Sequence, residues 1–125
     1  MSNVLVFGHQ NPDNDAIMSS VVLSQLLNQV EFDGNTYQAC CLGPLPAESA
    51  KLLEDNGVAA PMLIDAIEPA VEGEEAQLVV LCDHNEPGQS VAGLENAVIA
   101  GVVDHHRFGN FTTAAPLHIV ALPWG

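Results

Sequence analysis

The chain has 125 residues, the length of one domain, and 48% of them are hydrophobic, so we expect a single sizeable core. Sixteen acidic residues stand against only two basic ones, Lys51 and Arg107, and the formal net charge is −14. Nucleic-acid binding needs several cations to neutralise phosphates, so no nucleic-acid partner is expected. Without a basic leader, a membrane-length apolar run or a CxxC pair, the sequence favours a cytoplasmic protein with buried, reduced thiols and no membrane partner.

The first half of the chain predicts two strand-helix pairs. Residues 4–7 are a short apolar run, and residues 16–30 have the apolar spacing of a helix. Residues 36–42 are expected to form a second strand, and residues 46–56 a second helix that Gly57 ends. The apolar face of the first helix is expected to consist of Ile17, Val21, Leu26, Leu27 and Val30, with Ser20 and Ser24 mostly elsewhere.

The second half continues the alternation. Residues 61–75 predict a short strand or turn followed by a solvated connection, and the apolar run 78–82 predicts a strand that is buried on both faces. A short helix is expected around residues 89–94, followed by a strand that ends at "VVDHH" and a last strand over residues 117–122. Alternating strands and helices imply parallel βαβ units, so the predicted fold is α/β, with a parallel sheet flanked by helices.

Three of the predicted strands run directly into acidic residues and histidines, and in an open parallel sheet such strand ends meet along one edge. Neutral imidazoles mixed with carboxylates suit Mn²⁺, Fe²⁺, Co²⁺ or Zn²⁺, and the absence of a cysteine argues against structural zinc. Crowded carboxylates repel one another, and a pair of divalent cations removes that cost. Paired metals commonly hydrolyse phosphoanhydrides or phosphodiesters. The candidate metal ligands are His9, Asp13, Asp15, Asp83 and His105.

Each cluster taken alone has a simpler interpretation. "NPDND" is compatible with a turn and a helix cap, Asp83 with an ordinary loop acid, and His105 with His106 as a surface pair. His84 either helps to position a substrate or only fills its loop. The occurrence of all three clusters after three apolar strands favours the metal centre.

The segments "GHQNPDND", "VVLCDHNE" and "VVDHHR" together resemble the DHH phosphoesterase superfamily. Within it they resemble the family II inorganic pyrophosphatases, which depend on manganese or cobalt. The resemblance extends over essentially the whole chain, including "NFTTAAPLHIVALPWG". It implies that residues 1–125 form a Rossmann-like DHH catalytic domain, truncated relative to the family because the C-terminal DHHA2 domain is absent.

The resemblance also implies a role for each residue and a reaction, the hydrolysis of pyrophosphate by two Mn²⁺ or Co²⁺ ions, with Mg²⁺ as a companion of the substrate. One metal would be held by His9 and Asp13, and the other by Asp15 and His105. Asp83 would bridge the metals, and His106 would contact the substrate phosphate, which makes these two the catalytic residues. Residues in supporting or substrate-contacting positions would be Asp104, His84 and Arg107.

Members of the family continue past the position of Gly125 into a helix that carries a further aspartate ligand, and then into the DHHA2 domain with its basic residues. We therefore expect this chain alone to be weak or inactive, and to work as a homodimer or with a C-terminal domain supplied in trans. We also expect an exposed apolar patch near residues 117–124, where that helix would lie. Two alternatives remain: a phosphodiesterase acting on short oligonucleotides or cyclic dinucleotides, and a non-catalytic metal-binding fragment or subunit.

Overall fold

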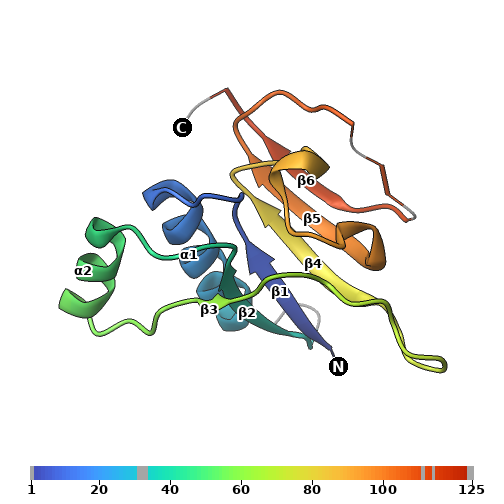
Figure 1. Ribbon diagram of the computed structural model, residues 1–125, viewed down its shortest axis with the longest axis horizontal. Coiled ribbons are helices and arrows are strands. Elements are labelled where there is room, and N and C mark those ends of the chain that lie inside the picture. The colour runs from blue at the N-terminus through green and yellow to red at the C-terminus, as the bar shows by residue number, and fades with distance from the viewer. Residues whose placement is uncertain (1, 31–33, 111, 114, 124–125) are drawn as a thin grey trace.

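A computed structural model of the chain describes residues 2–30, 34–110, 112–113 and 115–123 (Figure 1). Within these ranges six strands form one wholly parallel sheet in the order β3-β2-β1-β4-β5-β6. The strands are β1 (Asn3–Phe7), β2 (Thr36–Cys41), β3 (Met62–Leu63), β4 (Gln77–Cys82), β5 (Ala97–Asp104) and β6 (His118–Ala121). The helices are α1 (Asn14–Val30) and α2 (Ala47–Asp55), and two single 3₁₀ turns are η1 (Pro87–Gln89) and η2 (Leu94–Asn96). The predicted α/β fold with a parallel sheet is confirmed.

The order of the strands places one change of direction at the centre of the sheet. From β1 the chain moves outward through β2 to β3, then crosses back to β4 on the other side of β1 and continues to β5 and β6 (Figure 1). In open parallel sheets, the point where the direction of strand addition reverses leaves a crevice at the carboxyl ends of the two central strands. Here that point lies between β1 and β4.

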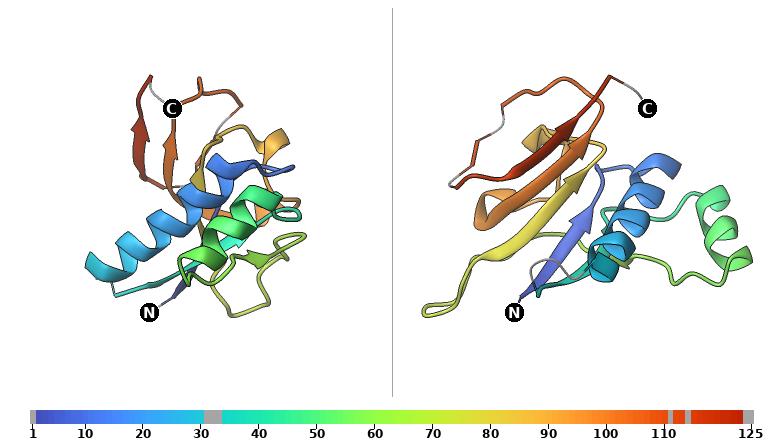
Figure 2. Two further views of the ribbon diagram at one scale, coloured as in Figure 1. Left: turned by 90° about the vertical axis from the view of Figure 1, so that its left-hand side faces the viewer. Right: turned by 180° about the vertical axis from the view of Figure 1, so that it is seen from behind.

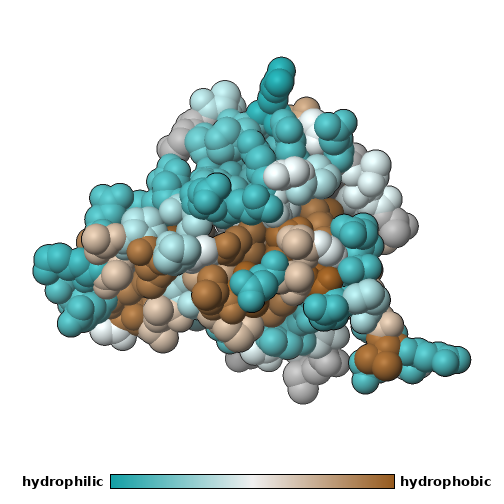
Figure 3. Space-filling view, in the orientation of Figure 1, coloured by the Kyte–Doolittle hydropathy of each residue, from teal (hydrophilic) through white to brown (hydrophobic). Residues whose placement is uncertain are grey.

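The core lies on both faces of the sheet, because α1 covers one face and the connections that contain η1 and η2 cover the other (Figure 2). Val4 and Val6 pack with Tyr37 on the α1 side, whereas Leu5 and Phe7 join the cluster on the opposite side. This alternation leaves β1 buried on both faces, as is typical of a central parallel strand. In the view of Figure 3, hydrophobic residues cross the middle of the molecule and hydrophilic ones cover the upper edge, where the strands end.

Most predicted elements are confirmed, but the buried face of α1 differs from the prediction. Leu26 and Val30 are 51% and 53% exposed. Ser20 and Ser24 are buried instead, and their hydroxyl groups donate to backbone carbonyls three or four residues earlier in the same helix. Because these local bonds satisfy the hydroxyl groups, the serines can face the sheet where the sequence pattern suggested a polar surface.

The short helix predicted around residues 89–94 is wrong. The segment instead forms η1 and η2, which are separated by residues 90–93, and Gly93 adopts the left-handed conformation with φ 78°. Ala92 makes a parallel bridge with Ala66, and Ile67 N–H donates to the carbonyl of Ala92. These long-range backbone bonds hold the segment extended. A single helical turn is too unstable on its own to compete with them.

The expected apolar patch near residues 117–124 is present among the described residues; Trp124 lies outside them. Ile119, Val120 and Leu122 are 37% to 44% exposed. A cavity of about 440 Å³ lies on the α1 side of the sheet, between Leu27 of α1 and Val120 of β6. Among the described residues, no helix combines the length and apolar character required to cross a membrane.

Candidate metal centre

The first loop of the site follows β1 directly and is fixed by close packing at Gly8. A Cβ atom at this position would lie 2.5 Å from the Cβ of Ala16 and 2.8 Å from its carbonyl oxygen, so only glycine lets the strand end approach α1 this closely. The next residue, His9, places Nδ1 2.7 Å from the carbonyl oxygen of Gln10. A carbonyl only accepts, so Nδ1 carries the proton and Nε2 keeps its lone pair, the form that a metal requires.

The helix cap expected within "NPDND" is Asp13, rather than Asn14 or Asp15, and Asp13 also lies beside His9. Its Oδ1 accepts a hydrogen bond of 3.0 Å from the N–H of Ala16 and thereby caps α1. The same oxygen lies 3.5 Å from Nε2 of His9. The helix cap therefore orients the carboxylate toward His9, so the cap and the polar cluster are compatible rather than competing explanations.

Asp83 lies at the centre of the arrangement, immediately after β4. Its backbone adopts the left-handed conformation with φ 57°, which aspartate tolerates better than most residues, and its N–H donates to the carbonyl of Val103. The side chain is 7% exposed, with Oδ2 3.3 Å from Nε2 of His9 and Oδ1 2.7 Å from Nε2 of His105. One carboxylate thus faces an imidazole from β1 with one oxygen and an imidazole from β5 with the other.

His105 and His106 follow the end of β5, and their rings lie 4.2 Å apart between centroids. The carboxylate of Asp104 holds this loop. Its Oδ1 accepts the backbone N–H groups of both histidines and Nδ1 of His106, the last at 2.7 Å. Burial alone would raise the pKa of Asp104, but hydrogen bonds from Asn85, His106 and the two N–H groups outweigh it and lower the pKa, so the carboxylate stays charged.

His84 is completely buried against Phe7 and uses both ring nitrogens within the fold. Nδ1 donates to the carbonyl of Cys82 at 2.7 Å, and Nε2 accepts from the hydroxyl of Ser90 at 2.8 Å. Burial lowers its pKa, which keeps the ring neutral. Of the two interpretations left open, this geometry supports the one in which His84 builds the loop.

The remaining predicted residues are more peripheral. Asp15 is exposed in the first turn of α1 and, with Asp83 and His105, lines a hollow of about 250 Å³. Arg107 is exposed, and its backbone carbonyl accepts a hydrogen bond from Asn85. Asn85 was not among the predicted site residues, although "DHNE" contains it. It is 1% exposed and joins the loops after β4 and β5.

The donor atoms form two groups that share Asp83. Within each group, every residue offers a ligand atom that lies within 4.8 Å of the others. The first group consists of His9, Asp13 and Asp83, and the second of Asp83, Asp104, His105 and His106. Ligand atoms about 2.1 Å from an octahedral ion lie about 3 Å apart, close to the separations of 3.3 and 3.5 Å around His9. The donor set and its spacing therefore fit a divalent cation on the His9 side of Asp83, and the second group offers carboxylate oxygens and imidazole nitrogens, the donors that such ions bind.

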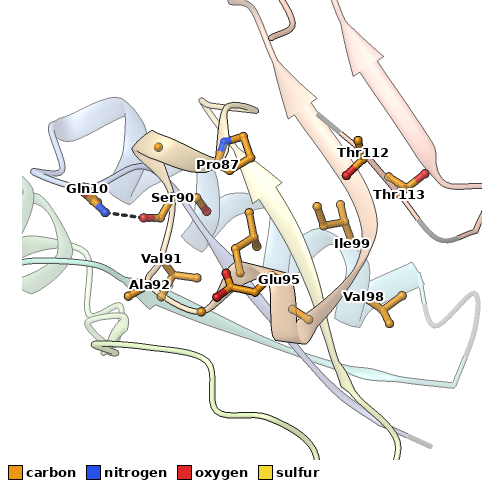
Figure 4. Close-up of a pocket in the computed structure, with 14 residues that line it drawn as sticks. Gln10, Pro87, Ser90, Val91, Ala92, Glu95, Val98, Ile99, Thr112 and Thr113 are labelled. Atoms are coloured by element: carbon orange, nitrogen blue, oxygen red, sulfur yellow. Dashed lines mark hydrogen bonds between the residues drawn. The ribbon is translucent and has the colours of Figure 1, made fainter. Parts of the chain in front are cut away.

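A cavity larger than the two already described lies away from these groups. It measures about 660 Å³ and is lined mainly by the segment around η1 and η2, together with Thr112 and Thr113 (Figure 4). Gln10 reaches its wall and donates to the carbonyl of Ser90 at 2.6 Å. This bond connects the loop of His9 to the segment that also holds His84.

A search against families of known proteins matches residues 3–124 to the domain described as "DHH family, N-terminal domain". The chain belongs to the DHH family. As a DHH domain it is 43% identical, over all 125 residues, to proteins named "Probable manganese-dependent inorganic pyrophosphatase" from Streptococcus agalactiae serotypes Ia and V. The DHH domain spans 38% of the length of these curated relatives.

A solved structure leads to the same group of proteins. The DHH domain superimposes on the crystal structure of a "putative family II inorganic pyrophosphatase" from Methanococcus jannaschii with a TM-score of 0.78 and 32% identity. The match covers 96% of this chain and 34% of that one. The resemblance noted in the three sequence segments thus extends to the arrangement of the whole domain.

Proposed function

We propose that this DHH domain binds two Mn²⁺ or Co²⁺ ions and forms the N-terminal catalytic part of an inorganic pyrophosphatase. The observation that carries the proposal is the position of Asp83, whose two oxygens face Nε2 of His9 and Nε2 of His105 at 3.3 and 2.7 Å. One ion is assigned to His9 and Asp13, the other to Asp15 and His105, with Asp83 shared between them.

Charge supports two ions rather than one. The carboxylates of the region, Asp13, Asp15, Asp83 and Asp104, carry four negative charges when ionised, which two divalent cations balance. Imidazole nitrogens and carboxylate oxygens together suit manganese and cobalt. The names of the relatives from Streptococcus agalactiae support manganese as the native metal. Mg²⁺ is proposed only as a companion of the substrate.

Two bound ions of this kind supply an activated water at neutral pH and stabilise charge on phosphoryl oxygens. The residues of the chain itself position the ligands and the substrate. Asp83 fixes the spacing of the two ligand groups, and His106 is proposed to contact a phosphate oxygen from its half-exposed position. Asp104 holds His106 from the protein side through the 2.7 Å contact with Nδ1. His84 and Arg107 are proposed to support the site through the loops that carry them.

We further propose that the pyrophosphatase activity belongs to a longer protein. The DHH domain covers about a third of the relatives' length, and Arg107 is its one arginine. A domain with a net charge of −14 attracts a polyanion such as pyrophosphate only through bound metal, so basic residues from elsewhere are required. A C-terminal domain would supply them, since a second copy of this chain brings only Lys51 and Arg107 again. The buried free thiols of Cys40, Cys41 and Cys82 support a reducing, cytoplasmic location.

Metal binding and hydrolysis are tested separately. Calorimetry and electron paramagnetic resonance with Mn²⁺ should give two ions per chain, magnetically coupled because they share Asp83; a single uncoupled ion would overturn the two-metal centre. With Mn²⁺, pyrophosphate is then compared with linear and cyclic dinucleotides. The domain alone should be slow on pyrophosphate and gain activity when the C-terminal part of a Streptococcus agalactiae relative is added in trans. A preference for dinucleotides would favour a phosphodiesterase, and metal binding without hydrolysis after that addition would favour a non-catalytic subunit.

A further inference from the structure

The inference concerns Asn85, a buried residue in the loop after β4. Its amide makes three hydrogen bonds: Nδ2 donates to Oδ2 of Asp104 at 2.7 Å and to the carbonyl of Arg107 at 2.9 Å, and Oδ1 accepts from the N–H of Gly109 at 3.0 Å. All three partners lie in the segment that begins at the end of β5. Asn85 thereby connects the loop that carries Asp83 to the loop that carries both histidines.

The contacts of Asn85 require asparagine rather than another polar residue. Nδ2 faces two acceptors and Oδ1 faces one donor, so the orientation of the amide follows from its partners. An aspartate here would place a second carboxylate against Asp104 and could not donate to the Arg107 carbonyl when ionised. A serine is shorter and has a single donor. With 1% exposure, water has little access to replace any bond that is lost.

Asn85 acts on His106 indirectly, by fixing the carboxylate of Asp104. The side chain of Asp104 is fully buried, and its two oxygens have different partners. Oδ1 receives the loop N–H groups and Nδ1 of His106, while Asn85 is the described donor to Oδ2. Holding both oxygens prevents the carboxylate from rotating about its last bond. An ionised carboxylate only accepts, so this fixed Oδ1 selects the form of His106 that is protonated on Nδ1.

We infer that Asn85 is a positioning residue that, through Asp104, keeps the proton of neutral His106 on Nδ1 and leaves Nε2 as the ring nitrogen that meets a ligand. The inference rests on the proposed function only for the identity of that ligand, a phosphate group. In water a histidine ring favours the proton on Nε2, so the opposite form at His106 requires a specific partner. Asn85 acts through that partner without itself touching the substrate.

The test is the tautomer of His106, measured by long-range nitrogen–proton NMR on histidine-labelled protein at pH 8 without metal or substrate. In the natural chain His106 should be mainly protonated on Nδ1. Loss of the Asn85 bonds in Asn85→Ala should lower the ratio of the Nδ1–H to the Nε2–H form by about fivefold, the effect of one net hydrogen bond. His84, whose Nδ1–H is held by the Cys82 carbonyl, is the internal reference.

Asn28→Ala is the matched control, because Asn28 also makes two hydrogen bonds, to the N–H and carbonyl of Tyr37, but far from the site. It should reduce stability and leave His106 unchanged. If Asn85→Ala does not fold, Asn85→Ser, which keeps one donor, should give an intermediate ratio. A natural chain with His106 mainly protonated on Nε2, or a folded Asn85 variant with an unchanged ratio, would overturn the inference. Because no metal or pyrophosphate is used, such a result would leave the proposed function standing.

Discussion

His9 and His105 come from loops 96 positions apart in the sequence, yet Asp83 lies between them, 3.3 Å from Nε2 of one and 2.7 Å from Nε2 of the other. The shared carboxylate couples the two ligand groups. A change at Asp83 should therefore affect both metal ions, whereas a change at His9 should affect mainly one.

Asp83→Asn keeps the shape of the side chain and removes its charge. We expect the affinity for both Mn²⁺ ions to fall by about tenfold or more, as judged by calorimetry, since even supporting partners of metal ligands contribute tenfold to a hundredfold. His9→Gln should weaken one ion more than the other. Asp55→Asn is the control, because this exposed acid pairs with Lys51 at 2.9 Å on α2. An equal loss in the control would show that net charge, and not the site, governs binding.

Gly8→Ala should destabilise the domain by about 1 to 3 kcal/mol, the usual cost of forcing an additional group into a packed interior. The new Cβ would meet the backbone of Ala16 at 2.7 to 2.8 Å and push α1 away from the end of β1. Urea unfolding measures the change. Gly88→Ala, where no atom lies within 4 Å of the added Cβ, should be nearly neutral. If both variants unfold at the same urea concentration, the close contact at Gly8 is not a determinant of stability.

The exposed apolar surface on β6 should make the 125-residue chain associate at high concentration. Val120 lies on the α1 side of the sheet, beside Val103. Val120→Lys should lower the association constant, measured by sedimentation velocity, because a charged group resists burial between copies. Val71→Lys changes the net charge equally at a position that is 66% exposed and outside this surface. A monodisperse natural chain, or an equal effect of Val71→Lys, would refute the prediction.

Alkaline pH should destabilise the fold through its buried thiols. Burial raises the pKa of Cys40 from an ordinary value of 9.0 to about 12, with a smaller contribution from Cys41. The unfolded chain therefore loses this proton near pH 9 while the folded chain keeps it, so the stabilisation is complete below pH 9 and is lost as the pH rises toward 12. The slope is at most about 1.4 kcal/mol per pH unit for each such thiol.

Cys40→Ala should make the free energy of unfolding less dependent on pH between 9 and 10.5, in urea titrations under reducing conditions. Val79→Ala removes buried volume from the same core without a titrating group. It should lower stability by a similar amount at every pH. An unchanged slope in Cys40→Ala would show that the thiol ionises with equal ease in both states.

The sheet and the meeting of the three polar loops could be predicted because each depends on local pattern and topology. The apolar runs that became β1, β4 and β5 need no distant information, and parallel pairing brings their carboxyl ends to one edge. That edge is where His9, Asp83 and His105 were expected to meet, and the structure places them there.

The features that could not be predicted depend on partners remote in the sequence. The sequence predicts a helix for the segment with η1 and η2, because the bridge between Ala92 and Ala66 that holds it extended joins residues 26 positions apart and leaves no local signal. The role of Asn85 could not be predicted for the same reason, since its hydrogen-bond partners are 19 to 24 residues further along the chain. The burial of Ser20 and Ser24 could not be predicted for the opposite reason. Their hydroxyl groups are satisfied by hydrogen bonds within one turn of the same helix, so these polar side chains can be buried.

The left-handed turn at Asp83 lies between the loop after β1, which carries His9, and the loop after β5, which carries His105. An ion held there would join β1, β4 and β5 without a covalent bond, and it would bind the folded chain alone, since the unfolded chain separates these residues. By mass action, a metal at a hundred times its dissociation constant adds about 2.7 kcal/mol to the free energy of unfolding. Manganese would then stabilise the folded state in addition to taking part in catalysis, and the thermal denaturation temperature would report how fully the metal centre is occupied.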